Sequence, residues 1–574
     1  MPGMFIVFEG IDGSGKTTLS NRVAKALRAR GLRVEHAREG GRFVSSVTQA
    51  IRDMCRDARN MAMVPRAELL LYVARELQLA EEVIAPALER ADVVIADRYL
   101  YTAEVLARQA RDLPDSFIRA IIDVAASGLW PDIAFLIDVD PSVARGRRKV
   151  AKVLARDARP ASRKGLTGSG LGQRLRQGYL DVATRDPDRW VVVDNSDADL
   201  DVLVAEISAA IASAHDAGVA MGIAGARAAA TGRNGGLHVL PDIDTPEEAL
   251  AAFLGWVDRR ARREPSLAAY VLSGLAGGGV DERRTTLAPL APQVIARGLR
   301  GLSDGVSWQL RRSLVELAPH EIALSLDDQA AEAPLAWSLR ELLAEAAPAE
   351  VAISLQGLDD ETAWALRAEL YGRVPDAVMT SLALLDSERS WHLRERWLAE
   401  RGGLEEAVTG YAAARATARS VAGLDDKRAW ALRKAAQPAA PVPALGSIRG
   451  VNSDRAWRWR ERMLRRAPKT VLSTIAGLDD ARAWAMRIAA SRQCREALDS
   501  MLGSDHPTAW QIREACLDIW PSSVVKSLGV LVSGARGAEL LHQALAAFPT
   551  HISLLKQATA VAIGVSLKPT VMAA

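Results

Sequence analysis

The residues best suited to chemistry lie near the N-terminus, where consecutive positions match the pattern G-x-x-x-x-G-K-[ST]. They run from Gly10 to Thr17, after a strand-like apolar stretch at 5–8 and before a helical stretch at 18–29. Strand, glycine loop and helix form the context in which this pattern binds phosphate, because freed backbone N–H groups and the helix N-terminus attract anions. The predicted phosphate-binding residues are Gly10, Ile11, Asp12, Gly13, Ser14, Gly15, Lys16, Thr17 and Thr18.

Two side chains of this loop have predicted roles of their own. Lys16 is expected to reach the β- and γ-phosphates of a nucleoside triphosphate, and the Thr17 hydroxyl is expected to ligate Mg²⁺. ATP is therefore the predicted phosphoryl donor and Mg²⁺ the predicted metal. The motif leaves the acceptor open among water, a protein and a small molecule.

The first part of the chain alternates strand-like and helical stretches, from residue 1 to about 213. Such alternation favours right-handed βαβ crossovers and a parallel sheet covered on both faces. We predict an α/β P-loop domain with a parallel five-stranded sheet and flanking helices. The expected strands are 5–8, 32–36, 92–97, 133–138 and 190–193.

The second half is a repeat in which a tryptophan is followed three residues later by an arginine. The pairs run from Trp308 and Arg311 to Trp510 and Arg513, mostly 26–29 residues apart with one gap of 39, and Trp256 with Arg259 fits as an earlier copy. Short helices cannot bury their apolar faces alone, so neighbouring units must stack. Residues 245–574 are predicted to form an all-α solenoid of helical hairpins about 27 residues long, HEAT-like in kind. Prolines eleven residues after the tryptophan mark the turns, at Pro319, Pro348, Pro375, Pro468 and Pro521.

The tryptophan–arginine pairs allow two interpretations. In the first, each tryptophan fills the groove against its neighbouring repeat, and the arginine stacks on it or pairs with an aspartate of the Gly-Leu-Asp-Asp turns at 357–360, 423–426 and 477–480. In the second, the pairs form an exposed stripe that binds an extended partner. In either case the solenoid is expected to bind a protein partner or to self-associate.

Composition narrows the class of protein. At 574 residues the chain is too long for one core, and residues 214–244, rich in Ala and Gly, are predicted to be a linker between the domains 1–213 and 245–574. Lys and Arg number 73 against 70 Asp and Glu, which does not suggest a nucleic-acid or membrane partner. The three cysteines are far apart and no apolar run is long enough to span a membrane, so we expect a cytoplasmic protein.

Four stretches resemble thymidylate kinases. Phe8–Thr18 closely resembles the start of those enzymes, and Glu81–Leu88, Asp97–Tyr99 and Pro131–Pro141 agree with them in order and spacing. The resemblance covers residues 4–212 and none of the repeats. It implies a nucleoside monophosphate kinase that phosphorylates dTMP with ATP and Mg²⁺.

The resemblance also implies roles for individual residues. Lys16, Asp97, Arg98 and Asp12 would be catalytic, and Thr17 and Asp97 would lie at the metal. Arg38, Arg75, Tyr99 and Thr102 would bind the acceptor. The alternatives are a strand-end ion pair for Asp97 with Arg98 and a solvated surface side chain for Arg38.

A basic segment from Arg145 to Arg176, with glycines at 165–170, falls where the family keeps its lid. A lid that closes over triphosphate excludes water and completes the site. Because the P-loop has Gly13 where some relatives have an arginine, the lid is expected to supply the arginine that stabilises the transition state. Its candidate cations are Arg147, Arg148, Lys149, Lys152, Arg156, Arg159, Arg163 and Lys164.

Base recognition departs from the family pattern. Arg75-Glu76 puts an acid where an arginine is expected, unless the helix shifts register, and Val105-Leu106-Ala107 replaces Ala-Tyr-Gln. The phosphate-handling half of the site is therefore expected to be intact and the base-reading half altered. The leading hypothesis is a dTMP kinase-like enzyme, and the sequence does not specify which nucleobase its acceptor carries. The second is a P-loop ATP-binding switch or sensor whose helical repeats bind a protein partner.

Overall fold

The computed structural model describes residues 3–39, 43–57, 60, 63–154, 169–196, 198–217, 246–277, 279–326, 333–492, 494–547 and 552–562. The chain divides into two compact units. The sheet unit comprises Met1–Arg148 with Ser162–Val239, and the helical unit comprises Lys149–Ala161 with Leu240–Ala574.

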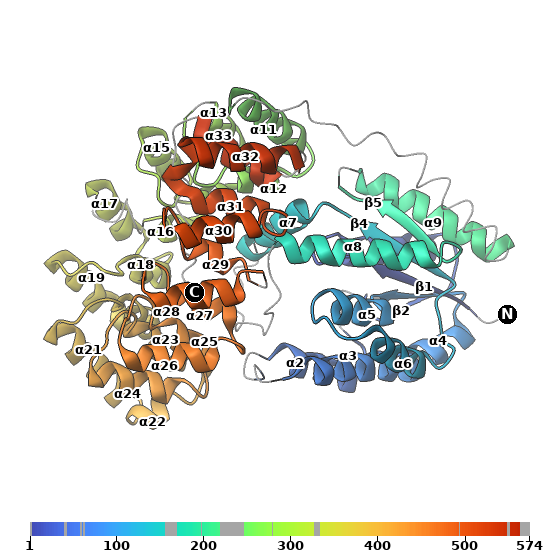
Figure 1. The fold of residues 1–574 in the computed structure, drawn as a ribbon, viewed down its shortest axis with the longest axis horizontal. Helices are drawn as coiled ribbons and strands as arrows, with labels where there is room; N and C mark the ends of the chain where they lie inside the picture. Colours follow the sequence, from blue (N-terminus) through green and yellow to red (C-terminus); the bar gives the residue numbers. More distant parts are fainter. Residues whose placement is uncertain are drawn as a thin grey trace. The chain divides into compact units, whose positions relative to one another are not determined.

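A parallel five-stranded sheet forms the centre of the sheet unit, in the order β2-β3-β1-β4-β5 (Figure 1). All five strands predicted from the sequence are present, and every neighbouring pair is parallel. The strands are β1 (Met4–Glu9), β2 (Val34–His36), β3 (Val93–Asp97), β4 (Ile133–Asp138) and β5 (Trp190–Asp194).

Helices cover both faces of this sheet, which is why its strands read as nearly continuous apolar runs. Along β1, Ile6 and Phe8 pack with α1 and α9, whereas Phe5 and Val7 pack with α3, α5 and α6 on the opposite face. The helices are α1 (Lys16–Ala29), α2 (Ser46–Arg56), α3 (Pro65–Leu79), the π-helical turn η3 (Ala80–Ile84), α4 (Ala85–Arg90), α5 (Leu100–Gln109), α6 (Asp115–Ala126), α7 (Pro141–Leu154), α8 (Ser169–Arg185) and α9 (Leu200–Ala217). Helix α9 thus extends into the predicted linker, and residues 218–244 lie outside the described part of the chain.

The helical unit is all-α in its described residues. From α12 onward, short helices that mostly begin at a proline pack one against the next in chain order, and helices that carry the tryptophan–arginine pairs alternate with them. The helices are α11 (Pro246–Ala261), α12 (Pro265–Val271), α13 (Val280–Leu287), α14 (Pro292–Gly298), α15 (Gly305–Ser313), α16 (Pro319–Leu324), α17 (Pro334–Leu343), α18 (Pro348–Ser354), α19 (Glu361–Tyr371), α20 (Pro375–Ser381), α21 (Glu388–Ala399), α22 (Leu404–Ala407), α23 (Tyr411–Ser420), α24 (Lys427–Ala436), α25 (Pro441–Gly446), α26 (Asp454–Met463), α27 (Pro468–Thr474), α28 (Ala481–Ala490), α29 (Glu496–Asp499), α30 (Pro507–Ala515), α31 (Pro521–Leu528), the 3-10 turn η5 (Gly529–Ser533), α32 (Ala535–Ala547) and α33 (Ile552–Ala562).

The repeated arginine is a buried hydrogen-bond donor. In the copy on α19, Arg367 is 0% exposed and donates from Nε to Ser381 Oγ (3.0 Å) and from Nη2 to the carbonyl of Leu355 (2.7 Å). It therefore connects its own helix to the short helices before and after it. Its guanidinium carbon lies 4.8 Å from the ring centroid of Trp364, which is 5% exposed. Across the Trp308–Trp510 copies this distance is 4.3–4.9 Å.

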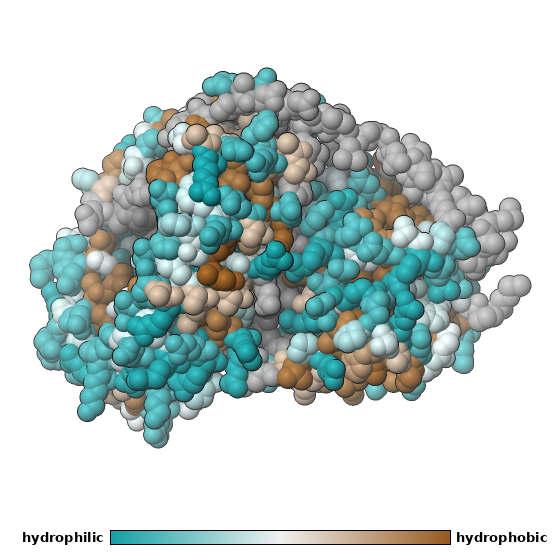
Figure 2. Space-filling view, viewed as in Figure 1, coloured by the Kyte–Doolittle hydropathy of each residue, from teal (hydrophilic) through white to brown (hydrophobic). Residues whose placement is uncertain are grey.

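These contacts confirm the first interpretation of the pairs, in which tryptophan and arginine are packed inside the repeats. The face of the helical unit visible in Figure 2 mixes hydrophilic areas with several hydrophobic patches. The turn aspartates divide two tasks that the sequence did not separate. Asp359 accepts a hydrogen bond from the Trp364 indole (2.7 Å), and Asp360 caps α19 by accepting from the Ala363 N–H (3.0 Å).

Two details of the predicted repeat are corrected. On α11 the guanidinium over Trp256 belongs to Arg260 and not to Arg259; positions three and four residues on both neighbour a side chain on a helix. Pro441 begins α25 just as the other prolines begin their short helices, so the proline series has a further member.

The last described helix meets the first helices of the same unit. Helix α33 packs extensively against α11 (Figure 1), and Lys556 donates from Nζ to the carbonyl of Ser273, just after α12. The two ends of the helical array therefore cover each other's apolar faces. Among the described residues, no helix is both long and apolar enough to cross a membrane.

The buried arginines predict a large effect of a charge-conserving change. Arg367→Lys keeps the positive charge but loses the planar fork, so buried carbonyl and hydroxyl groups lose their donor, and we expect the helical unit to be destabilised by about 3 kcal/mol. Urea unfolding followed by tryptophan fluorescence measures this, since all tryptophans except Trp130 and Trp190 lie in the predicted repeat region.

A matched control is available on the same tryptophan. Arg389 stacks on Trp364 at 4.8 Å, pairs with Glu361, and has a side chain that is 51% exposed. Arg389→Lys should change stability by less than about 1 kcal/mol. Equal effects of the two substitutions would contradict the structural role assigned to Arg367.

Candidate functional site

The candidate site forms where β1 and β3 end beside each other. Phe8 of β1 is in register with Asp97 of β3, and the two strands are parallel, so the loop that follows β1 lies next to the Asp97-Arg98 pair. The carboxyl ends of parallel strands are the usual position of ligand sites in α/β folds. The sheet thus brings together two motifs that are far apart in the sequence.

The loop after β1 has the tight backbone that phosphate binding requires. Gly10, Gly13 and Gly15 all have positive φ angles, of 136°, 92° and 97°. A Cβ on Gly13 would lie 2.3 Å from the Ala144 carbonyl oxygen, so no other residue fits there. A residue distant in the sequence also fixes the loop, because the side-chain amide of Asn195 donates to the Ser14 carbonyl (2.7 Å).

Lys16 is folded back over this loop. Its ammonium donates to the Ile11 carbonyl (2.7 Å) and to Ser14 Oγ (3.3 Å). Burial, followed by repulsion from Arg98, lowers the pKa of Lys16 to about 7. Without an anion the side chain is therefore close to losing its proton at neutral pH, and a bound polyphosphate would restore its charge.

Asp97 and Thr17 present oxygen atoms to the same point. Thr17 Oγ1 donates to Asp97 Oδ2 (2.5 Å), while the buried Oδ1 atom of Asp97 has no hydrogen-bond partner in the described part of the chain. Burial tends to raise the pKa of Asp97, but Lys16, Arg38 and Arg98 hold it below its ordinary value. A hydroxyl and an ionised carboxylate are ligands that suit Mg²⁺, so these residues fit the metal.

The described residues contain no cluster of three or more His, Cys, Asp or Glu side chains able to hold a metal ion. In nucleotide sites Mg²⁺ is usually held by one or two protein oxygens together with the substrate phosphates.

Arg98 is the centre of a hydrogen-bond network. It donates to Asp12 Oδ1 (2.5 Å), Thr102 Oγ1 (2.9 Å), the Tyr179 hydroxyl (3.0 Å) and the Gly10 carbonyl (3.1 Å). Its φ of 79° is rare for a residue with a side chain, and such strain persists only where the surroundings hold it. Burial tends to lower the pKa of Arg98, yet Tyr179 and Asp12 leave it raised, so the guanidinium is permanently charged.

Arg38 also reaches the site, which excludes the alternative of a solvated surface side chain. Its Nη1 atom donates to the Asp97 carbonyl (3.3 Å) and lies 3.8 Å from Asp97 Oδ2, and its guanidinium lies over the Phe43 ring at 5.0 Å. The side chain is only 12% exposed. The neighbouring Gly40 and Gly41 lie outside the described residues.

Arg75 lines the cavity despite the acid at the next position. It pairs with Glu76 and lies over the rings of Tyr72 (5.0 Å) and Phe43 (5.6 Å). The π-helical turn Ala80–Ile84 follows directly, and such a turn accommodates one extra residue within a helix. This shift of register begins at Ala80, so it leaves Arg75 and Glu76 in the register of α3.

Tyr99 is a correction to the predicted acceptor-binding set. Its ring packs edge-on against Phe5 at 5.3 Å, its hydroxyl donates to the Leu129 carbonyl (3.1 Å), and the residue is 0% exposed. The residue after Arg98 is thus a core residue, because the strand-to-helix turn points alternate side chains in opposite directions. Thr102, by contrast, lines the cavity, where it donates to Glu9 Oε2 (2.6 Å).

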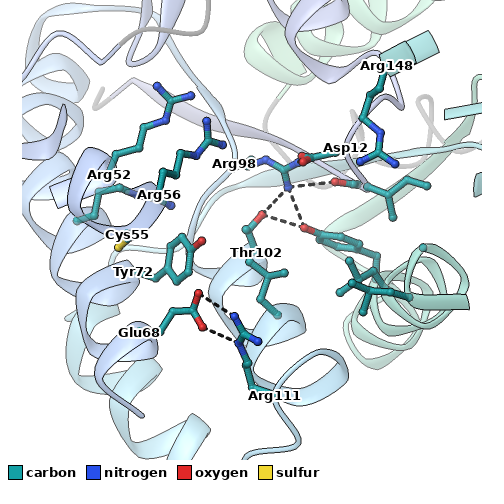
Figure 3. A pocket seen from close by; sticks show the side chains of 18 of the residues that line it. Asp12, Arg52, Cys55, Arg56, Glu68, Tyr72, Arg98, Thr102, Arg111 and Arg148 are labelled. Atoms are coloured by element: carbon teal, nitrogen blue, oxygen red, sulfur yellow. Dashed lines mark hydrogen bonds and ion pairs between the residues drawn. The ribbon is translucent and has the colours of Figure 1, made fainter. Parts of the chain in front are cut away.

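The cavity extends from the P-loop to the far end of α3 and α5 (Figure 3). Sequence reasoning missed several of its residues. Arginine spacing along α2 signals Arg52 and Arg56, which are one helical turn apart, but no local pattern signals the ion pair between Glu68 and Arg111 or the contact of Tyr179 with Arg98. The missed lining residues are Arg52, Cys55, Arg56, Glu68, Tyr72, Arg111 and Tyr179.

The predicted lid is helical at both of its ends. Arg147, Arg148, Lys149 and Lys152 lie on α7, and α8 is already formed at Arg176, which pairs with Asp138 (2.6 and 2.7 Å). The remaining candidate cations, Arg156, Arg159, Arg163 and Lys164, lie outside the described residues.

Comparisons with known proteins match this part of the chain. The family model described as thymidylate kinase matches residues 8–207. The thymidylate kinase of Bifidobacterium longum (strain DJO10A) is 37% identical over 199 residues, which is 34% of this chain and 91% of that protein. That of Geobacter sulfurreducens is 38% identical over 195 residues, covering 34% and 90%.

The chain belongs to the thymidylate kinase family. It is therefore a nucleoside monophosphate kinase, an enzyme of the transferase class, through residues 8–207. The matched segment holds the P-loop and the Asp97-Arg98 pair, and the helical repeats lie beyond it. A crystal structure of thymidylate kinase from Ehrlichia chaffeensis aligns with 37% of this chain and 99% of its own at 24% identity, with a TM-score of 0.27.

His36 stabilises the thymidylate kinase-family domain next to Arg38. Its Nδ1 atom accepts from the Arg38 N–H (3.1 Å), so Nε2 carries the proton and faces Ser20 Oγ (3.1 Å). Burial, opposed mainly by Asp97, lowers the pKa of His36 to about 4. The ring is thus neutral in the folded protein at every pH where an unfolded histidine is partly charged.

The depressed pKa of His36 predicts acid sensitivity. The unfolded chain takes up a proton near pH 6.5 and the folded chain only near pH 4, so the contribution to stability is complete above pH 6.5 and is lost as the pH falls toward 4. We expect the loss to reach about 3 kcal/mol. Urea unfolding at pH 7.5, 6 and 5 measures it against His36→Gln, which cannot titrate. Parallel pH dependence in the two proteins would refute this assignment.

Proposed function

We propose that the chain transfers the terminal phosphoryl group of ATP to dTMP, forming ADP and dTDP. The observation that carries this proposal is the position of Arg98 and Arg38, which lie beside the P-loop at the entrance of a cavity large enough to continue to α3 and α5. Two guanidinium groups there suit the phosphate of an acceptor, because a planar fork matches phosphate oxygens. The relatives named above are thymidylate kinases.

Each site residue has a proposed task. The P-loop residues Gly10–Thr18 hold the phosphates of ATP, and Lys16 moves from the Ile11 carbonyl to the β- and γ-phosphates. Thr17 and Asp97 hold Mg²⁺, which neutralises charge on the phosphates when bound. Phosphoryl transfer depends on positioning and charge neutralisation more than on covalent catalysis, and these residues provide both.

On the acceptor side, Arg98 and Arg38 hold the acceptor phosphate in line with ATP, with Arg75 and Thr102 as further contacts. Asp12 orients Arg98 through their ion pair and faces the acceptor sugar. At the base end, Leu106 lines the cavity where the family pattern has a tyrosine.

The regions outside the matched segment carry further proposals. We propose a kinase domain at 1–213, a linker at 214–244 and a helical-repeat solenoid at 245–574, supported by the ordered packing of its short helices. Such an array offers a surface for a protein partner or for self-association. The three cysteines are buried and form no disulfide, which supports the proposed cytoplasmic location. No observation favours the ATP-binding switch as the main function.

The decisive experiment is ADP formation by the full chain with Mg-ATP and a panel of acceptors, namely dTMP, dUMP, dCMP, UMP and GMP. We expect acceptor-dependent turnover, fastest among the panel with dTMP or a close relative. Lys16→Ala should reduce it by at least about 100-fold, because the charge on the transferred phosphoryl group loses its partner. ATP binding without acceptor-dependent turnover would rule out the kinase proposal. The ATP-binding switch would then be the remaining hypothesis.

A second substitution tests the proposed metal site. Asp97→Asn removes the ionised oxygen but keeps the shape, so we expect kcat to fall by about 100-fold and the Mg²⁺ concentration for half-maximal rate to rise. A Mg²⁺ titration of the steady-state rate measures both. Asp92→Asn is the control, since Asp92 directly precedes β3, at the opposite end of that strand from Asp97, and pairs with Arg33 (2.6 Å). An unchanged Mg²⁺ requirement would contradict the role of Asp97.

A further inference from the structure

The end of the cavity farthest from the P-loop is formed by a residue outside every motif. Arg111 lies in the turn after α5, and this turn is fixed by a hydrogen bond from the Leu113 N–H to the Ala107 carbonyl (3.1 Å). In Figure 3, Arg111 is at the opposite end of the cavity from Arg98 and Asp12. A nucleotide with its phosphate at Arg98 would direct its base toward this end.

The Arg111 side chain is held rigidly by an acid on α3. Its Nε atom donates to Glu68 Oε2 (2.6 Å) and its Nη2 atom to Glu68 Oε1 (3.1 Å). The Glu68 side chain is 8% exposed and that of Arg111 is 23% exposed. A bidentate pair of this kind fixes the plane of the guanidinium.

The pair leaves one donor group for a ligand. Within the described residues, Nη1 of Arg111 has no hydrogen-bond partner, and it is not closed off from the cavity. A guanidinium is a donor only and cannot lose its proton in a protein. Whatever binds beside it must therefore present an acceptor atom.

The surroundings make this requirement strict. Tyr72, Leu106 and Leu175 line the same cavity, so a base bound there would displace water from around this donor. An unpaired polar group in such a place costs far more than a matched one contributes. Arg75 is less suited to read the base edge, because it pairs with Glu76 and lies over the Tyr72 ring.

We propose that Arg111, oriented by Glu68, reads the far edge of the acceptor base and selects bases that present a carbonyl oxygen there. Thymine and uracil have such an oxygen at C4, whereas cytosine has an amino group that would face another donor. This proposal rests on the proposed function in assuming a nucleoside monophosphate acceptor. It assigns base selection to a residue outside the P-loop and the Asp97-Arg98 pair.

The test compares dUMP with dCMP, a pair that differs on this edge of the base. With Mg-ATP and the full chain, we expect kcat/KM for dUMP to exceed that for dCMP by about 10- to 100-fold. In Arg111→Gln the amide can donate or accept, so this ratio should fall to within about threefold, mainly through a higher KM for dUMP. Glu68→Gln keeps Arg111 but loosens it, and should lower the ratio by a smaller factor.

Arg108→Gln is the matched control. Arg108 is on the same helix and pairs with Glu104 and Asp115 (both 2.7 Å), but it does not line the cavity. It should leave the ratio unchanged. Thermal unfolding of each variant identifies any loss of folding, and the double variant Glu68→Gln with Arg111→Gln keeps a neutral, matched pair if Arg111→Gln alone is unstable.

The outcomes separate this proposal from the proposed function. Turnover of dUMP and dCMP at equal efficiency, or a ratio that Arg111→Gln leaves intact, overturns the role of Arg111 while the kinase activity stands. If no acceptor is turned over, calorimetric titration of dUMP and dCMP in the presence of a non-hydrolysable ATP analogue decides. Preferential binding of dUMP that is lost in Arg111→Gln then supports base reading without transfer, and equal or absent binding overturns it.

Discussion

The parallel pairing of β1 with β3 is the constraint on which the site depends. With Phe8 opposite Asp97, the P-loop and the Asp97-Arg98 turn leave the sheet at the same level. Thr17 can then reach the Asp97 carboxylate, and Arg98 can donate to the Gly10 carbonyl. A slip of one residue would turn every side chain of β3 to the opposite face of the sheet and separate these groups. The close packing of β1 and β3 side chains against helices on both faces opposes that slip, because the exchanged side chains differ in shape.

Charge is distributed unevenly around the cavity that opens from this point. Arginines line it at many positions, whereas its lining acids are each engaged, Asp12 with Arg98 and Glu68 with Arg111. An excess of cations in a half-enclosed space favours anionic ligands and repels cations. The lowered pKa values of Lys16 and Arg52, to about 7 and about 10, have the same origin in burial and neighbouring positive charge. A bound nucleotide relieves that repulsion.

Buried arginines serve a different purpose in the helical unit. There the guanidinium groups donate mainly to backbone carbonyls and to serine hydroxyls, as Arg433 does to Val421 and Ser447. The carbonyls at the end of a short helix lack partners within the helix, so an arginine from the next helix satisfies them. Burial lowers the pKa of Arg433 to about 10, which still leaves it charged at neutral pH. The same kind of side chain thus lines the cavity in one unit and joins helices in the other.

The sequence by itself determined the P-loop, the five strands and the tryptophan–arginine repeat, because each depends on spacing within a short segment. It did not determine where single side chains point or which distant residues meet. That Tyr99 enters the core, that Arg260 takes the place expected of Arg259, and that Arg111 pairs with Glu68 were decided only by packing. The contact of α33 with α11 is of the same kind. Local patterns follow from the backbone period, whereas these contacts depend on how whole elements dock, which no short segment encodes.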